Sequence, residues 1–136
     1  MVRIAGGIVI GIMAGLAVIL VFEWLGHTLF PLPAEPGLRN PEAVGQIAAA
    51  IPLPAMLFAV LSWFAGAFAG GTVAAAIGRR HWLAWIIAAL VAASAILNIL
   101  MIPHPVWMQI AAVAAPLLGG LFAGHLGDRL RGRTAA

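Results

Sequence analysis

Four long apolar runs constrain this chain more than any other feature of its sequence. The hydrocarbon core of a bilayer is about 30 Å thick, and a helix of about 20 apolar residues crosses it. We therefore expect membrane-spanning helices at about residues 4–30, 54–77, 82–102 and 106–126. Only residues 78–81 and 103–105 separate the last three runs, and links this short force consecutive helices to lie antiparallel. The sequence thus predicts an all-α fold, a transmembrane up-down four-helix bundle that forms a single domain over residues 1–136.

The charged residues agree with a membrane protein and exclude other classes. Only 8% of the residues are charged and 64% are hydrophobic, whereas a soluble domain has about 25% charged residues. All seven basic residues are arginines that lie outside the apolar runs, and they form no basic stripe, so we expect no nucleic-acid partner. The lipid bilayer is the expected environment. The lack of cysteine excludes disulfides and thiolate chemistry.

The arginines also predict an orientation, because basic residues are enriched in cytoplasmic loops. If the four helices alternate in direction, six arginines fall on one side and only Arg39 falls on the other. The six are Arg3, Arg79, Arg80, Arg129, Arg131 and Arg133. We expect both termini to be cytoplasmic in a bacterial inner (plasma) membrane. The first run is longer than the apolar part of a signal peptide, which favours an uncleaved helix.

The one long connection, residues 31–53, is rich in proline and lies on the outer side in this orientation. In its middle, Asn40, Pro41 and Glu42 form a helix start signal, because asparagine caps well, proline fits the first position and glutamate favours the positive helix end. We expect a short amphipathic helix over residues 41–50. It would lie on the membrane surface or fold over the mouth of the bundle.

Glycines recur at four-residue intervals in three of the four apolar runs. Small residues at this spacing let two helices approach closely within a bilayer. They predict either helix contacts inside the bundle or a face that joins copies of the chain into a homo-oligomer. The glycines are Gly7, Gly11, Gly15, Gly66, Gly70, Gly120 and Gly124.

Polar residues gather in the outer half of the predicted bundle. Counting 1.5 Å per residue from the outer helix ends places Glu23 about 12 Å below Pro31 and Asn98 about 7 Å below Pro103. All four helices or their ends contribute, which predicts a ligand or proton site at the outer mouth. The candidate residues are Glu23, His27, Ser62, Ser94, Asn98 and His104.

Glu23 carries the most information, because an ionisable side chain within a membrane-spanning helix is costly and normally has a partner. His27 lies four residues later and so shares its helix face. Three interpretations remain open. The two residues form a structural polar pair; or they handle a proton or cation, since histidine exchanges protons near neutral pH; or His27 and His104, with Glu23, hold a metal or porphyrin.

No enzyme is indicated, because no catalytic template such as GxSxG, HExxH or a Walker A loop occurs. The leading hypothesis is a small membrane protein that binds or transports a proton, cation or small ligand. The alternatives are a noncatalytic accessory subunit of a larger membrane complex and, third, a haem- or quinone-binding redox protein. The sequence names no cofactor.

Two segments resemble a known group of proteins. Residues 23–27, Glu-Trp-Leu-Gly-His, and residues 101–105, Met-Ile-Pro-His-Pro, are similar to segments of a family of small bacterial four-span membrane proteins without an assigned function. Residues 68–75 and 98–107 extend the likeness over more of the chain. The resemblance implies the same four-helix fold and a bacterial inner membrane, and it implies no activity.

Overall fold

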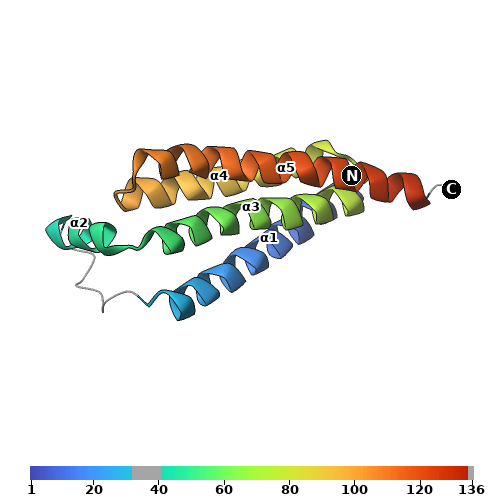
Figure 1. Cartoon of the computed structure of the whole chain (residues 1–136). Coiled ribbons are helices and arrows are strands. Elements are labelled where there is room, and N and C mark those ends of the chain that lie inside the picture. Colours follow the sequence, from blue (N-terminus) through green and yellow to red (C-terminus); the bar gives the residue numbers. More distant parts are fainter. Residues whose placement is uncertain (32–40, 135–136) are drawn as a thin grey trace.

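The structure, a computed structural model, describes residues 1–31 and 41–134, and side chains for 1–31, 42, 45–46 and 49–129. Five helices make up almost all of it: α1 (Val2–Leu29), α2 (Pro41–Ala50), α3 (Leu53–Gly78), α4 (Trp82–Met101) and α5 (Val106–Thr134). Four of them are long and apolar enough to cross a membrane. They pack as a bundle of alternating direction (Figure 1), so the predicted fold class is confirmed.

The helix ends lie within two residues of the expected ones, except at the C-terminus. There α5 continues past the apolar part, which was expected to end at residue 126. Residues 127–134 contain no proline and several arginines, which favour helix, so nothing in this stretch ends the helix. α5 therefore has an apolar part, Val106–Arg129 by composition, and a short polar extension.

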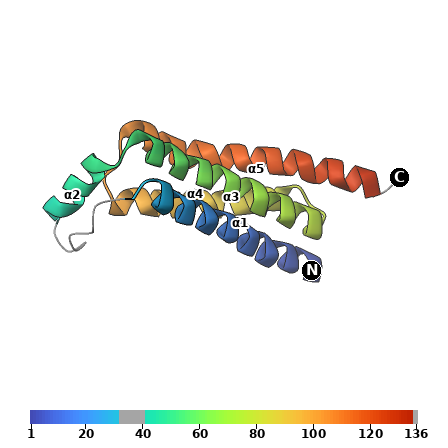
Figure 2. The ribbon, with the colours of Figure 1, turned by 60° about the horizontal axis from the view of Figure 1, so that its bottom comes forward.

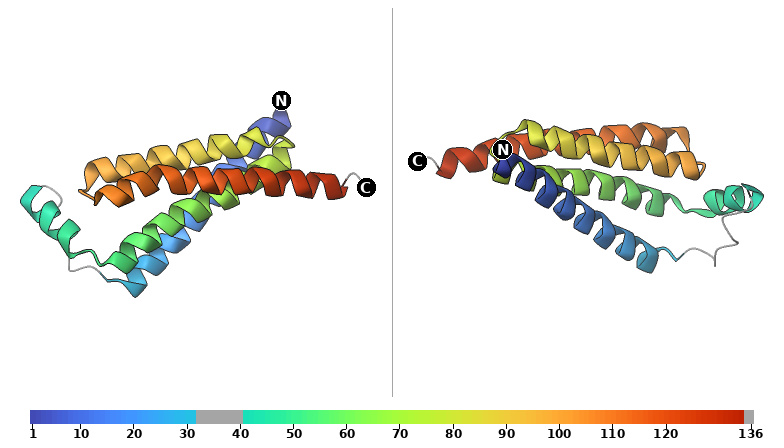
Figure 3. Two further views of the ribbon diagram at one scale, coloured as in Figure 1. Left: turned by 45° about the horizontal axis from the view of Figure 1, so that its top comes forward. Right: turned by 180° about the vertical axis from the view of Figure 1, so that it is seen from behind.

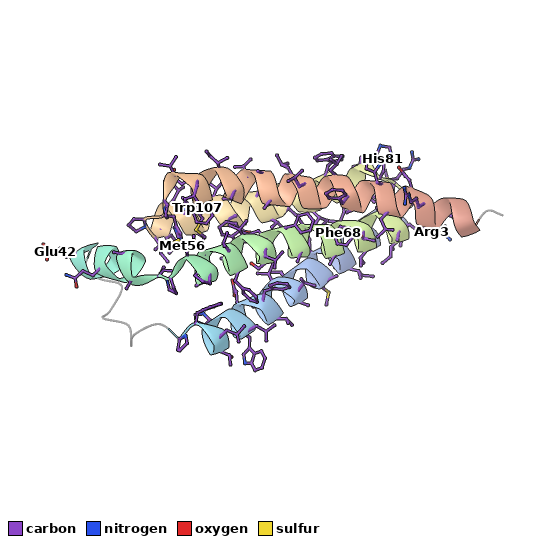
Figure 4. All side chains as sticks on the ribbon, in the orientation of Figure 1. Arg3, Glu42, Met56, Phe68, His81 and Trp107 are labelled. Carbon is purple, nitrogen blue, oxygen red and sulfur yellow. The ribbon has the colours of Figure 1, made fainter. Side chains whose placement is uncertain are left out.

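The two ends of the bundle differ in chemistry. At one end lie both chain termini and the turn from α3 to α4, with the exposed side chains of Arg3, Arg79, Arg80 and Arg129; we call this the arginine end (Figure 2). At the other end lie residues 30–31, α2, residues 51–52 and the turn at 102–105; we call this the loop end. Figure 4 shows Arg3 and His81 at the arginine end, with Glu42 at the opposite end. The start of α1 and the end of α5 therefore lie at the same end of the bundle.

α3 is the central helix, and α1 packs along it through the predicted glycines. A Cβ atom added to Gly11 would lie 2.8 Å from the carbonyl oxygen of Gly70, and one added to Gly15 would lie 3.0 Å from that of Gly66. Such distances leave no room for a side chain, so glycine is what allows the two backbones to touch. The glycines of α1 and α3 thus lie at a contact inside the bundle.

α5 also packs on α3 and α4 through glycines that leave room for close contact. A Cβ atom on Gly120 would lie 2.6 Å from the Cβ of Ala88, and one on Gly119 would lie 2.6 Å from the carbonyl oxygen of Phe64. Gly124 is less crowded, with the carbonyl oxygen of His81 at 3.8 Å. The core between these helices is built mostly from alanine, and its largest fully buried side chains are Leu83, Ile87, Met108 and Pro116.

Toward the loop end α1 moves away from α4, whereas α3 stays in one core with α4 and α5, where Met56 and Trp63 share a cluster with Met108. Figure 3 shows α1 diverging from α4 and α5 toward the loop end in both views. Among the described residues, α1 packs mainly on α3, touches α4 little and does not touch α5. One side of α4 therefore loses its neighbour as the helix approaches the loop end.

α2 extends beyond the loop end of α3 (Figures 1 and 2), and between described residues it contacts no other helix. It thus does not fold over the bundle mouth, which was one of its two expected placements. The apolar side chains expected on it, such as Val44 and Ile47, lie outside the described residues.

Candidate functional site

One stripe of α4 changes from apolar to polar where the helix loses its neighbour. At the arginine end the stripe is buried: Leu83, Ile87 and Val91 are 0%, 2% and 7% exposed. Ser94 and Asn98 continue the same stripe at helical spacing, and both are exposed. The face that packs against α1 and α3 at the arginine end therefore becomes an open polar face near the loop end.

A matching stripe runs along α1. Ile12 and Ile19 are partly buried against the core that α3, α4 and α5 form. Glu23 and His27 follow Ile19 at intervals of four residues, so they lie on the same side of the helix. Both are exposed.

The two polar stripes lie at the same level of the bundle. A Cβ atom on Gly70 would lie 3.1 Å from the Cα of Gly15 in α1 and 3.0 Å from the Cγ2 of Ile87 in α4, so these two residues share a layer. α1 and α4 both run from the arginine end to the loop end, and equal steps along them rise equally. Counting residues from that layer places Glu23 at about the same level along the bundle as Ser94, and His27 at about the same level as Asn98.

Phenylalanines fix the loop end of α1 on α3. The ring of Phe58 in α3 lies 5.2 Å from that of Phe22 and 6.2 Å from that of Phe30, measured between centroids. Gly26 faces the same ring, since a Cβ atom there would lie 3.5 Å from its Cδ1. These contacts keep α1, and with it Glu23 and His27, on α3 rather than on α4.

We name Glu23, His27, Ser94 and Asn98 the polar quartet. The Ser94 hydroxyl donates to the carbonyl oxygen of Val91 in its own helix at 2.8 Å, so its oxygen is left to act as an acceptor. Within the described residues, neither Glu23 nor His27 has a hydrogen bond or ion pair. The quartet includes a carboxylate, an amide oxygen and a hydroxyl oxygen, and acceptors of these kinds suit a cation.

The structure does not bring Ser62 into this set. Ser62 is 3% exposed, and its hydroxyl donates to the carbonyl oxygen of Ala59 at 2.7 Å. Its one proton is thus used within α3, as that of Thr72 is toward the carbonyl oxygen of Phe68. Ser62 lies in the packed part of the bundle, whereas the quartet lies on the open face.

His104 also stands apart from the quartet. It is half-buried in the turn between α4 and α5, where its Nδ1 lies 2.6 Å from the carbonyl oxygen of Ile102. The carbonyl oxygen of His104 accepts a hydrogen bond of 3.1 Å from the Gln109 side chain. These contacts brace the turn, and they place His104 beyond the end of α4 rather than at the level of Glu23.

A metal centre receives no support from this arrangement. Among the described side chains, no group of three or more His, Cys, Asp or Glu residues is close enough to hold a metal ion. In particular, Glu23, His27 and His104 are not gathered into one cluster.

Depth counting along the sequence found the quartet but could not separate it from Ser62 and His104. The signal that separates them is spacing: residues 83, 87, 91, 94 and 98 form one helical stripe on which apolar residues give way to polar ones. The exposure of Glu23 and His27 on α1 could not be predicted from spacing, because it depends on which helix α1 packs against.

Comparison with known proteins adds no relative: no family model, curated protein or solved structure matches this chain.

Proposed function

We propose that this is a multi-pass membrane protein that binds a small cation, a proton included, at the polar quartet between α1 and α4. The single observation behind the proposal is the pair of matched stripes. Two parallel helices that pack through apolar residues at one end carry exposed polar side chains at matching levels near the other, Glu23 and His27 on α1 and Ser94 and Asn98 on α4.

The energetics favour an occupant. An ionised carboxylate on the apolar surface of a membrane-spanning helix costs a few kcal/mol unless it is protonated, paired or hydrated. A cation bound between Glu23 and the oxygens of Ser94 and Asn98 would offset that cost. His27, one helical turn nearer the loop end, would exchange protons between the site and water.

For the placement in the cell, we propose that the arginine end faces the cytoplasm of a bacterial inner membrane. Four exposed arginines lie at that end, and no arginine of the described residues lies at the other. This asymmetry follows the positive-inside rule. The quartet would then open toward the outer leaflet.

Thermal unfolding in neutral detergent tests cation binding directly. A cation that binds only the folded protein, supplied at 100 times its dissociation constant, adds about 2.7 kcal/mol of stability. The protein is melted in NaCl, KCl and MgCl2 at constant ionic strength, and proton movement is followed in vesicles with an entrapped pH-sensitive dye. We expect Glu23→Gln to abolish the response, whereas Glu42→Gln, the matched change on α2, leaves it intact.

Two results would contradict the proposal. One is a Glu23→Gln protein that keeps the full cation and proton response. The other is a native protein that is stabilised by no cation and moves no protons, although circular dichroism shows it folded. In the second case the Glu23–His27 pair serves structure alone.

An accessory subunit of a larger complex is the second candidate, and the open side of the bundle favours it. Because α1 does not contact α5 among the described residues, a helix from another protein would have room beside α1 and α4. A stoichiometric partner that copurifies in mild detergent, and that Glu23→Gln or Asn98→Leu releases, would support this function. Visible absorbance or a bound metal in gently purified protein would support the third, a redox role.

A further inference from the structure

The turn at the arginine end contains a backbone conformation that its residue does not favour. Arg79 follows the last residue of α3 and has φ 56° and ψ 34°, in the left-handed region. Among the described residues it is the only one other than glycine with a positive φ. Glycine is by far the commonest residue at this position after a helix, because a Cβ atom is strained there.

Glycine is used freely in this chain, including at the preceding residue. Gly78 is buried, and a Cβ atom on it would collide with the side chain of Leu83. In this turn Gly78 therefore makes the close contact, and an arginine takes the left-handed position, where glycine would be more stable. Strain of this kind at one residue points to a function for its side chain.

The Arg79 side chain is exposed beside other cations from separate parts of the chain. The carbonyl oxygen of Arg3 lies 3.6 Å from a Cβ position on Gly78, which brings the start of α1 next to the turn. Arg80 follows directly, and Arg129 lies near the end of α5. The carboxylate of Asp128, on α5 at this end, already has an interaction in the structure.

Tryptophans mark the depth of this cluster. Trp82 and Trp85 lie in the first turn of α4, directly after the arginine turn, and each is 42% exposed. Tryptophan is enriched where the hydrocarbon of a membrane meets its headgroups. The arginines thus lie at the level at which lipid phosphates are found.

We propose that Arg79 and Arg80, with Arg3 beside them, bind the phosphate headgroup of an anionic phospholipid in the leaflet at the arginine end. Guanidinium groups suit this ligand because they donate two parallel hydrogen bonds to phosphate oxygens. The left-handed turn presents two consecutive arginines at the membrane surface, and the negative lipid compensates the strain at Arg79. The site is independent of the polar quartet, which lies at the other end.

Quenching by brominated lipids measures this binding. The protein, with Trp24 and Trp107 replaced by Phe, is placed in phosphatidylcholine nanodiscs that contain increasing amounts of dibrominated phosphatidylglycerol. Trp82 and Trp85 are then the exposed tryptophans that report lipid at the arginine end, and Trp63, buried in the core, adds a background signal that is the same in all variants. Since each arginine near an anionic surface contributes an affinity factor of about fivefold to tenfold, we expect Arg79→Gly and Arg80→Gln each to weaken the preference for phosphatidylglycerol by about that factor. The control Arg39→Gly, in the connection between α1 and α2 along the sequence, should leave it unchanged.

Stability in pure phosphatidylcholine separates the proposal from a structural role. Arg79→Gly relieves the left-handed strain, so its melting temperature should equal or exceed that of the parent protein, while Arg80→Gln should leave it unchanged. An Arg79→Gly protein that binds phosphatidylglycerol as well as its parent would overturn the proposal. So would one that melts lower in phosphatidylcholine, because Arg79 would then stabilise the turn itself. Displacement of the brominated lipid by inorganic phosphate at equal concentration would assign the site to free phosphate instead.

Discussion

The contact between α1 and α3 leads to a sharp prediction, for which Gly11→Ala is the perturbation. A Cβ atom at this position would lie 2.7 Å from the Cβ of Ala74 and 2.8 Å from the carbonyl oxygen of Gly70. Carbon atoms pack best at about 3.5–4.0 Å, so the two helices would have to separate by about 0.8 Å. Neither obstacle can rotate away, because one is a backbone oxygen and the other is a Cβ atom fixed to the backbone.

The cost of that separation can be worked out from the lost packing. Each pair of atoms in contact contributes about 0.1–0.2 kcal/mol of dispersion energy. A gap of about 0.5–1 Å removes a quarter to a half of that energy. If about 40 pairs around Gly11 are affected, as many as a buried leucine makes, the loss is about 2 kcal/mol. This value lies within the range of about 1–3 kcal/mol for overpacked cores.

The matched control lies on the same helix. A Cβ atom on Gly6 would meet no atom within 4 Å, so Gly6→Ala changes the same residue type without a collision. Because alanine favours helix over glycine by up to about 1 kcal/mol, we expect this variant to be as stable as the parent protein or slightly more stable. The free energy of unfolding is measured by titrating the protein from neutral detergent into SDS, with far-UV circular dichroism as the readout.

Equal free energies of unfolding for Gly11→Ala and Gly6→Ala would refute this account of the α1–α3 contact. Size-exclusion chromatography adds a second criterion, because the glycines could also have formed a face between copies of the chain. If Gly11 packs within one chain, its substitution lowers stability and leaves the oligomeric mass unchanged. A change in mass without a change in stability would assign the glycines to an oligomer interface.

Three further predictions use the same SDS titration. Gly119→Ala should lower the free energy of unfolding by about 1–3 kcal/mol, because its Cβ atom would lie 2.6 Å from the carbonyl oxygen of Phe64; a neutral result would contradict the α3–α5 contact. Ser62→Ala should change stability by less than about 1 kcal/mol, because the hydroxyl bonds only within its own helix; a larger loss would reveal a partner on another helix. Trp63→Ala should cost about 3–5 kcal/mol, because this side chain is 7% exposed in the core, and a cost below 1 kcal/mol would show that the core is not packed around it.

The helices and their order could be predicted because apolar length and proline position act locally. Pro41 begins α2, and the short links at residues 78–81 and 103–105 set antiparallel neighbours whatever the rest of the chain does. The candidate site was only partly predictable. Depth is a count along one helix, whereas the difference between buried Ser62 and exposed Ser94 depends on where the neighbouring helix lies.

The conformation of Arg79 could not be predicted at all. Its neighbour Gly78 is the residue that a sequence pattern would assign to the left-handed position after a helix. The structure instead uses Gly78 for a close contact with Leu83 and leaves the left-handed position to the arginine. The choice between the two residues is made by packing between helices, which leaves no local signal.

The divergence of α1 from α4 has a mechanical consequence. α1 is held on α3 by glycines near Gly11 and by the ring of Phe58, whereas α3 is also packed on α4 and α5 in the core around Trp63, so a joint tilt of α1 and α3 would repack that core. For a tilt of α1 alone, the layer of Gly15, Gly70 and Ile87 is the fulcrum, and His27 lies about 18 Å along the helix from it at 1.5 Å per residue. A tilt of about 5° would move His27 by about 1.5 Å while the fulcrum hardly moves. A tilt of this kind would let an event at the loop end change the distance between α1 and α4 there without unpacking the arginine end.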